Sequence, residues 1–427
     1  MRSFLLAAAL SLAVSACTKP YATPEFDAGI PTMGKTRDGL PAVGDKTFTG
    51  IAQELGTGRK LKVFWTHGMC NHDARWALNT YSLFKQALNS SGITTNKAAK
   101  SERLVFRMRP DLELWTYVWS DITRKRKRDL YFDAPTGTEY RFSDGNRTDY
   151  DDTSNKPDRA EPQFPYKRAG ANAMLKKIIM NECLADAVIV SGPSRTELYT
   201  DARKNVCKYL GGALHADSVT CTVPETREEG TSRIIVAESL GSKIIADAVW
   251  ALKPGGSDAA KAEFGNRIAS IKQIFLLANQ IPILDLAGPL VQPGITGVTA
   301  PGSPAKTSLA QLISRIRAYR NASVQFTGKP VVVAFSDPND VLSYRLLNDH
   351  ISSKARLVNV IVSNDWTFTP PFFGDYGLET PDTAHCDYRG NNAVLSLMVV
   401  GNPGNGENTW QAVSDRIESN DEKRCGF

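Results

Sequence analysis

Short apolar runs recur along the chain and predict the strands of a buried sheet. Most of the runs show no alternation of polar and apolar residues, as is typical of strands that are covered on both faces. One run alternates in the way a strand with two different faces does. The runs are Leu61–Trp65, Leu112–Trp119 (the alternating one), Ile234–Ala237, Ile271–Ala278, Val331–Phe335 and Leu357–Val362.

Stretches with apolar residues at helical spacing lie between these runs. They cover 74–89, 167–181, 244–252, 309–319 and 393–400. The order of strands and helices predicts the α/β class, with a doubly wound, mostly parallel sheet. Ligands of such sheets bind beyond the carboxyl ends of the strands, so we expect the chemical residues to gather there.

The length of 427 residues is enough for one large domain with insertions. We expect this domain to cover residues 57–427, with polar insertions near 121–165 and 184–230. The second insertion is a candidate lid over the site. A signal peptide over 1–16 and a flexible tether over 17–56 are expected to precede the domain.

The charges of the chain are nearly balanced. Lysine and arginine number 51 against 45 aspartates and glutamates, which gives a formal net charge of +6. This excess is too slight on a chain of this size to indicate a nucleic-acid partner. One dense basic cluster, Arg124–Arg128, is interpreted as a solvated loop, with contact to a phospholipid headgroup as the alternative.

The amino-terminal segment Met1–Cys17 has one positive charge, an apolar run and then small residues that end at a cysteine. A run this short is typical of a secretory signal and is too short to span a bilayer. Val14-Ser15-Ala16-Cys17 resembles the lipobox of bacterial lipoproteins, which implies lipid attachment at Cys17. Because Thr18 is not an aspartate, the resemblance favours the outer membrane. Prolines and glycines in the following stretch predict the tether.

The remaining cysteines are Cys70, Cys183, Cys207, Cys221, Cys386 and Cys425. An even number in an exported chain predicts disulfides, but six cysteines allow fifteen pairings. We favour only the pair Cys207–Cys221, because both residues fall in one insertion. No cysteine or histidine spacing suggests zinc, so neither a metal nor a cofactor is expected.

The stretch Arg233–Leu252 carries the strongest chemical signal. An apolar strand run passes into a helical pattern within a few residues, and Ser239 lies on the turn between them. Ala237 and Gly241 flank the serine at positions where a sharp turn has room only for small side chains. The pattern resembles the nucleophile elbow G-x-S-x-G of the α/β-hydrolase family, with alanine in place of the first glycine. The alternative is a serine that caps an ordinary helix.

The strand run Leu61–Trp65 is followed by Thr66-His67-Gly68-Met69. In the hydrolase family a strand that ends in His-Gly precedes the loop that helps to hold the oxyanion. The resemblance therefore implies that the N–H groups of Met69 and Leu240 form the oxyanion hole. His67 and His72 are interpreted as structural residues whose hydrogen bonds shape the turn.

A catalytic serine needs a histidine base, and the base needs a carboxylate. Only His350 and His385 follow Ser239 in the order that this fold implies. His385 is the better base because it lies in a loop beyond the last predicted strand. For the acid we prefer Asp340 over Asp337, which precedes a proline and could instead cap the turn.

These features predict a membrane-anchored serine hydrolase that cleaves carboxylic esters through a Ser-His-Asp triad and an acyl-enzyme. Its substrate would be an acyl ester, and lipids, small esters and cell-wall esters are all compatible with the sequence. The alternative is a lipoprotein that keeps the fold as a binding or scaffolding module without catalysis. A histidine placed away from the serine would favour that alternative.

Overall fold

The computed structural model describes residues 18–20, 24–27, 46–96, 104–127, 130, 169, 172, 175–287, 307–323, 326–351, 354–364, 366–368, 381–404 and 409–418. The predicted signal peptide with Cys17, most of the insertion predicted over 121–165, and Cys425 lie outside these residues. Within the described part of the chain, no helix is both long and apolar enough to cross a bilayer.

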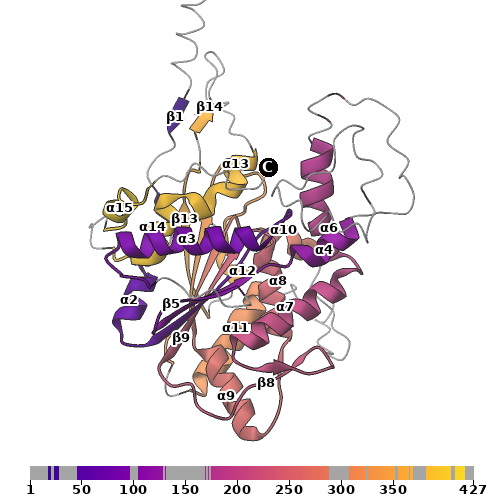
Figure 1. Ribbon diagram of the computed structural model, residues 1–427, viewed down its shortest axis with the longest axis vertical. Coiled ribbons are helices and arrows are strands. Elements are labelled where there is room, and N and C mark those ends of the chain that lie inside the picture. Colours follow the sequence, from indigo (N-terminus) through magenta and orange to yellow (C-terminus); the bar gives the residue numbers. More distant parts are fainter. Residues whose placement is uncertain are drawn as a thin grey trace, which may run out of the picture.

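A large, mostly parallel sheet forms the centre of the molecule (Figure 1). Its order is β2-β13-β12-β11-β9-β4-β6-β5, and the two outer strands run antiparallel to their neighbours. All six predicted runs are strands of this sheet, which confirms the α/β class. The bounds are β2 (Glu25–Asp27), β13 (Arg356–Ile361), β12 (Val331–Ser336), β11 (Ile271–Leu277), β9 (Thr231–Glu238), β4 (Lys60–Thr66), β6 (Leu112–Tyr117) and β5 (Val105–Arg109).

Strand β9 lies in the middle of the sheet, and its apolar run Ile234–Ala237 is buried between the two layers of helices. It pairs in parallel with β4 on one side and with β11 on the other, so that Ile235 is opposite Phe64 and Ile274. Every residue of β9 except Glu238 is buried. A strand paired on both edges and covered on both faces is a rigid support for the residue that follows it.

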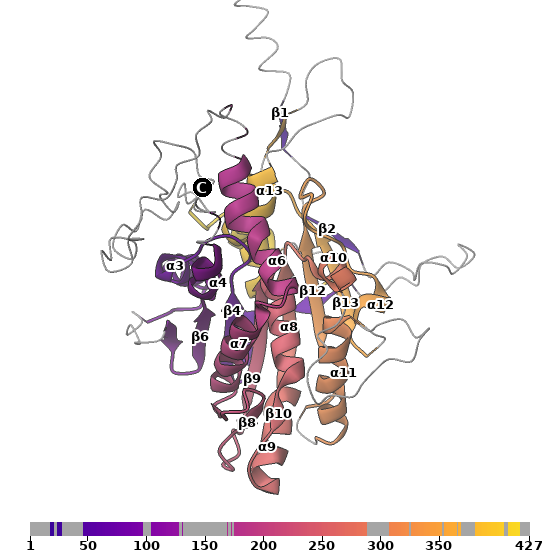
Figure 2. The same cartoon turned by 90° about the vertical axis from the view of Figure 1, so that its right-hand side faces the viewer.

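Helices cover both faces of the sheet and produce two apolar cores. One core is covered by the helices in front of the sheet in Figure 2, which are α7 (Arg195–Tyr209), α8 (Gly241–Ala251), α9 (Asp258–Ala269) and α11 (Ser308–Asn321). The other is covered by α2 (Ile51–Gly56), α3 (Ala74–Ser90), α14 (Asn392–Val400) and α15 (Thr409–Ser414). Each fully buried leucine or isoleucine in these cores contributes roughly 1.5–3 kcal/mol.

Part of the predicted tether is folded onto the domain. Strand β2 pairs with β13 at the edge of the main sheet. Strand β3 (Phe48–Thr49) pairs with β15 (Gly401–Asn402), and β1 (Thr18–Pro20) pairs with β14 (Trp366–Phe368). Phe48 and Ile51 are buried. The prolines and glycines of this stretch predicted a tether, but its few apolar residues are sufficient to hold it against the core.

The basic cluster is not a solvated loop in its described part. It lies on α4 (Ser120–Lys127), where Arg124 and Lys127 are buried and three residues apart on one face. The Lys127 ammonium is 2.8 Å from a carboxylate oxygen of Asp186, and it also donates to the carbonyl of Glu182. A buried lysine needs such partners, and no pattern along the chain indicates a carboxylate so far from the cluster.

The insertion predicted over 184–230, the candidate lid, lies mainly against one face of the sheet. Helix α7 packs on α8, and Leu198, Ala202 and Val206 are buried in the core. The rest contains β7 (Ala213–Leu214) and β8 (Thr220–Thr222), which form a small sheet with β10 (Lys253–Pro254). The disulfide Cys207–Cys221 joins α7 to β8, which confirms the favoured pairing.

The direction in which strands are added to the sheet reverses between β4 and β9. From β4 the chain adds β5 and β6 on one side, and then β9, β11, β12 and β13 in turn on the other. The crevice at such a reversal, beyond the carboxyl ends of the strands, is where ligands bind in open α/β sheets. The residues that follow β4 and β9 therefore meet at the position expected for a site.

Candidate active site

Ser239 lies on a sharp turn between β9 and α8. Its φ is +48°, a left-handed conformation that is costly for a serine. The turn is held because the Ser239 N–H donates to the Leu277 carbonyl at 2.7 Å. Gly241 is required here, since a Cβ on it would lie 2.3 Å from the His67 carbonyl oxygen. The small residues identified in the sequence thus allow α8 to begin against the end of β4.

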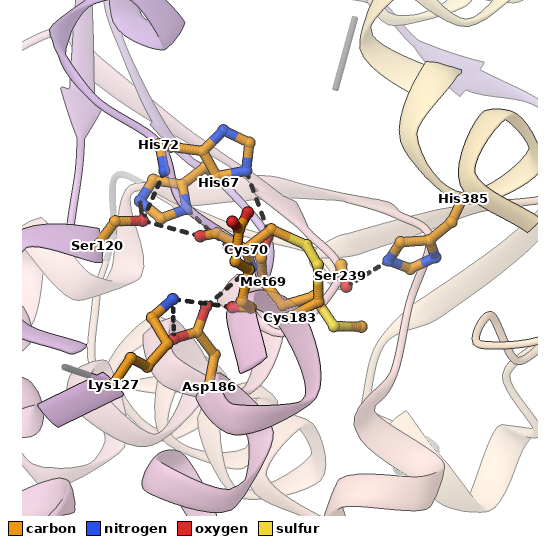
Figure 3. Close-up of a disulfide and its surroundings, with 12 residues drawn as sticks. His67, Met69, Cys70, His72, Ser120, Lys127, Cys183, Asp186, Ser239 and His385 are labelled. Carbon is orange, nitrogen blue, oxygen red and sulfur yellow. Dashed lines mark hydrogen bonds and ion pairs between the residues drawn. A yellow bond between two sulfur atoms is a disulfide. The ribbon is translucent and has the colours of Figure 1, made fainter. Parts of the chain in front are cut away.

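The structure brings Ser239, His385 and Asp340 together. His385 lies on the short helix α13 (Pro381–Cys386), and its Nε2 is 2.9 Å from the Ser239 Oγ (Figure 3). Asp340 lies in the turn after β12, and its two carboxylate oxygens are 2.9 and 3.0 Å from His385 Nδ1. Because a carboxylate only accepts hydrogen bonds, Nδ1 carries a proton and Nε2 is free to accept one from the serine.

Asp337 has a different role from Asp340. One of its carboxylate oxygens accepts from the Asn339 N–H at 2.9 Å, and the other accepts from the Asn364 N–H at 2.6 Å. These bonds fix the turn after β12, as the sequence suggested for an aspartate before a proline. The other histidine after the serine, His350, lies on the short helix α12 (Asn348–Ile351) and accepts from the N–H of Leu347, the residue before this helix.

The loop after β4 passes very close to the serine. A Cβ on Gly68 would lie 2.7 Å from the Ser239 Cβ, so only glycine permits this approach. In the described part of the chain, the N–H groups of Met69 and Leu240 have no protein acceptor. Met69 lies beside Ser239 in Figure 3, and Leu240 is the first residue after it at the N-terminus of α8. Two free donors, one in the loop after β4 and one at a helix N-terminus, favour negative charge.

His67 and His72 hold this loop, as predicted. The Trp119 N–H donates to His67 Nε2 at 3.0 Å, so Nδ1 carries the proton and donates to the Gly68 carbonyl at 2.7 Å. In a trans peptide the C=O and the next N–H point in opposite directions, so this bond also orients the Met69 N–H. His72 Nε2 donates to the Met69 carbonyl at 3.1 Å.

Both rings are neutral. Burial, together with the neighbouring His72, lowers the pKa of His67 well below its usual value. Burial, reinforced by the positive charge of Arg389, lowers the pKa of His72 to about 3. A neutral ring keeps one donor and one acceptor, which is the pattern that the loop uses.

A disulfide anchors the same loop. Cys70 is bonded to Cys183, which lies 113 residues further along the chain on the π-helix η3 (Leu175–Leu184), and Figure 3 shows this bond next to Met69. The Cys70 N–H donates to a carboxylate oxygen of Asp186 at 2.8 Å, on the adjoining helix α6 (Ala185–Ser191). Cys386 is also disulfide-bonded. The Cys70 bond was not predictable from spacing.

Left-handed backbone is concentrated at the site. Five non-glycine residues of the described chain have a positive φ, and three of them lie at the site. Ser239 and Ala278 directly follow the ends of β9 and β11, and Cys70 lies in the loop after β4. Such conformations cost about 1–3 kcal/mol each and persist where the surrounding structure holds them. Functional sites are where they gather most often, so this supports a site at the ends of β4, β9 and β11.

Several residues that the sequence reasoning missed support the site. The Tyr388 hydroxyl donates to an Asp340 carboxylate oxygen at 3.0 Å and accepts from the Asp337 N–H at 2.6 Å. Its spacing of three from His385 is the signal that could have identified it. Glu238 accepts from the Trp65 indole at 2.7 Å, and burial raises its pKa. Burial lowers the pKa of Arg389, and the charge of Glu238 opposes that shift.

Among the described residues, no group of three or more histidine, cysteine, aspartate or glutamate side chains has the geometry to hold a metal ion. Comparison of the chain with protein-family models, with curated proteins and with solved structures finds no match. The geometry of the site therefore carries the functional argument.

Proposed function

We propose that the protein is a serine hydrolase of the α/β-hydrolase type that cleaves carboxylic esters. The observation that carries this proposal is the unbroken set of hydrogen bonds from Asp340 through His385 to Ser239. Contacts within hydrogen-bond reach satisfy the geometric requirement for a nucleophile, its base and the group that orients the base. The resemblance of the elbow and of the His-Gly loop to this family supports the same reaction.

In the proposed reaction, His385 Nε2 accepts the Ser239 hydroxyl proton while the oxygen attacks the ester carbonyl carbon. The carbonyl oxygen becomes an oxyanion that the N–H groups of Met69 and Leu240 stabilise. His385 then gives its proton to the departing alcohol, which leaves an acyl group on the serine. Water, deprotonated by the same histidine, hydrolyses this ester and regenerates the free serine.

The alternative is a binding module without catalysis, and a displaced histidine would have favoured it. The 2.9 Å distance between Ser239 Oγ and His385 Nε2 supports the hydrolase instead. The left-handed backbone at Ser239 also favours it, because a helix cap does not need that strain.

The proposed location is the cell envelope, with lipid on Cys17. This part of the proposal depends on the sequence of the first seventeen residues, which lie outside the described part of the chain. The disulfides Cys70–Cys183 and Cys207–Cys221 support it, because such bonds persist in oxidising compartments.

Turnover of 4-nitrophenyl acetate by a form that lacks the leader tests the reaction. Ser239→Ala is expected to lower kcat by about three to six orders of magnitude, and His385→Gln by a similar factor. Their thermal unfolding should match that of the parent protein. Undiminished turnover by a folded Ser239→Ala variant would defeat the proposal.

A further inference from the structure

The cavity that the described residues form beside Ser239 is small. The cavity that contains the serine and His385 has a volume of about 30 Å³. A water molecule needs roughly 10–15 Å³ of such volume, so the cavity has room for about two water molecules. Pockets for drug-sized ligands measure about 300–1,000 Å³. An acetyl methyl group, which is close to a water molecule in size, fits this space, whereas a fatty acyl chain does not.

The wall of the cavity that β11 forms cannot easily move away from Ser239. Leu277 and Ala278 line it at the end of this central strand, and both are buried. The Leu277 carbonyl accepts from the Ser239 N–H at 2.7 Å, and the Ala278 N–H donates to the Phe335 carbonyl at 3.3 Å. Any movement of this wall would break bonds that connect three neighbouring strands.

Another part of the wall is formed by the oxyanion loop and is also held. Gly68 and Met69 line it, and Met69 is buried. The loop is fixed by His67 through the Gly68 carbonyl and by the disulfide from Cys70 to Cys183. The Met69 side chain is therefore the part of this wall that a substitution can remove while the backbone donor stays.

Two of the remaining lining residues carry charged groups. Glu238 and Arg389 both face the cavity. The Arg389 guanidinium donates to Thr80 Oγ1 at 3.0 Å and lies 5.3 Å from the centre of the Trp76 ring, so it is held in place. Methylene groups pressed against a carboxylate and a guanidinium would remove water from them without offering hydrogen bonds, which is unfavourable.

We infer that Ser239 accepts only short acyl groups, so that the substrates are acetyl or propionyl esters and not esters of fatty acids. This inference rests on the proposed function and narrows its substrate class. The cavity beside the serine limits the acyl part alone. The alcohol part of the substrate would lie outside the cavity and is not restricted by it.

A series of 4-nitrophenyl esters from acetate to octanoate tests the inference, because the leaving group stays the same and only the acyl chain changes. The expected kcat/KM is highest for acetate or propionate. Beyond propionate it should fall about tenfold or more for each added methylene. A kcat/KM that is equal along the series or that rises toward octanoate would overturn the inference.

A matched pair of variants tests whether Met69 limits the length of the acyl chain. Met69→Ala enlarges the cavity and keeps the backbone N–H, so the ratio of kcat/KM for butyrate to that for acetate should rise about tenfold. Leu286→Ala removes a large apolar side chain that is 84% exposed and does not line the cavity, so its ratio should stay that of the parent protein. An unchanged ratio in a folded Met69→Ala variant, or an equal rise in Leu286→Ala, would contradict the assignment.

The failure of the inference and the failure of the proposed function give different results. If a fluorophosphonate labels Ser239 and octanoate is the best ester, the protein is a serine hydrolase and only the limit on chain length is wrong. If the folded protein is not labelled and hydrolyses none of the esters, the proposed function itself fails. Labelling with a preference for acetate supports both.

Discussion

Substitution of Gly68 by alanine is the sharpest perturbation that the structure offers. The added Cβ would lie 2.7 Å from the Ser239 Cβ, and 3.4 Å from both the Ser239 Oγ and the Glu238 carbonyl oxygen. Carbon atoms normally approach to about 3.5–4.0 Å, so the two groups must separate by about 1 Å. The question is which of them moves.

Strand β9 is the less mobile partner. It is hydrogen-bonded to β4 and β11 on its two edges, and the Ser239 N–H is bonded to the Leu277 carbonyl. The loop therefore moves, and it takes the Met69 N–H away from the position of the oxyanion. Removal of one oxyanion donor costs about 10²–10³-fold in kcat. A shift of about 1 Å in a reacting group costs about 10²-fold.

The assay is kcat for 4-nitrophenyl acetate together with thermal unfolding. We expect Gly68→Ala to lower kcat by about 10²–10³-fold, while overpacking costs about 1–3 kcal/mol of stability. Gly56→Ala is the matched control, since a Cβ on Gly56 meets nothing within 4 Å at the end of α2. It should keep full activity. A folded Gly68→Ala variant with the activity of the parent protein would refute the placement of this loop as the oxyanion donor.

Three further predictions follow from the contacts around the site. Asp340→Asn should lower kcat by about 10⁴-fold, because an amide does not stabilise the protonated ring. Asp337→Asn should leave kcat close to that of the parent protein, because the Asp337 carboxylate accepts from the Asn339 and Asn364 N–H groups and an amide oxygen can accept in its place. Replacing both Cys70 and Cys183 by serine should lower the free energy of unfolding by about 4–5 kcal/mol, because the disulfide joins residues that are 113 positions apart. It should also reduce kcat, because Met69 is next to Cys70 in the oxyanion loop. The free energy of unfolding should fall as the pH is lowered from about 6.5 to about 3, in part because the pKa of His72 is about 3 in the native protein and 6.5 in the unfolded chain. His72→Gln should make the free energy of unfolding less dependent on pH in this range.

Each of these predictions has its own control. Between the two pKa values of His72 the unfolded chain binds more protons than the native protein. The contribution of His72 to stability is therefore complete above pH 6.5 and is lost as the pH falls toward 3. Urea unfolding at several pH values measures it, and an unchanged slope in His72→Gln contradicts it. For the disulfide, loss of Cys207–Cys221 should cost only about 3 kcal/mol, because 14 residues separate the pair, and should spare kcat. Equal loss of kcat in both disulfide variants, or equal kcat in both aspartate variants, would count against the account.

The central strands could be predicted because each is a short apolar run with no competing signal. Strand β5 was missed because only Phe106 and Met108 of its five residues are buried, and so short an alternation does not distinguish a strand from a loop. Strand β2 was missed because three residues give no period at all. The basic helix α4 was misjudged for another reason: its buried Lys127 depends on Asp186, and no pattern along the chain links residues that far apart.

Within the site, the elbow, His385 and Asp340 could be proposed from local patterns and chain order. The supports of these residues could not, because they come from distant segments. The Cys70–Cys183 bond is one of fifteen pairings that six cysteines allow, and Glu238 has no local motif that shows its contact with Trp65. Tyr388 is the exception, since its position three residues after His385 places both on one side of a helical turn.

The proposed function requires the Ser239 oxygen to be an activated nucleophile. A fluorophosphonate probe, followed by proteolysis and mass mapping of the adduct, measures this directly on the folded protein. We expect a stoichiometric adduct on the peptide that contains Ser239, and none on that peptide in Ser239→Ala. An unlabelled native protein, or an adduct confined to another residue, would contradict it.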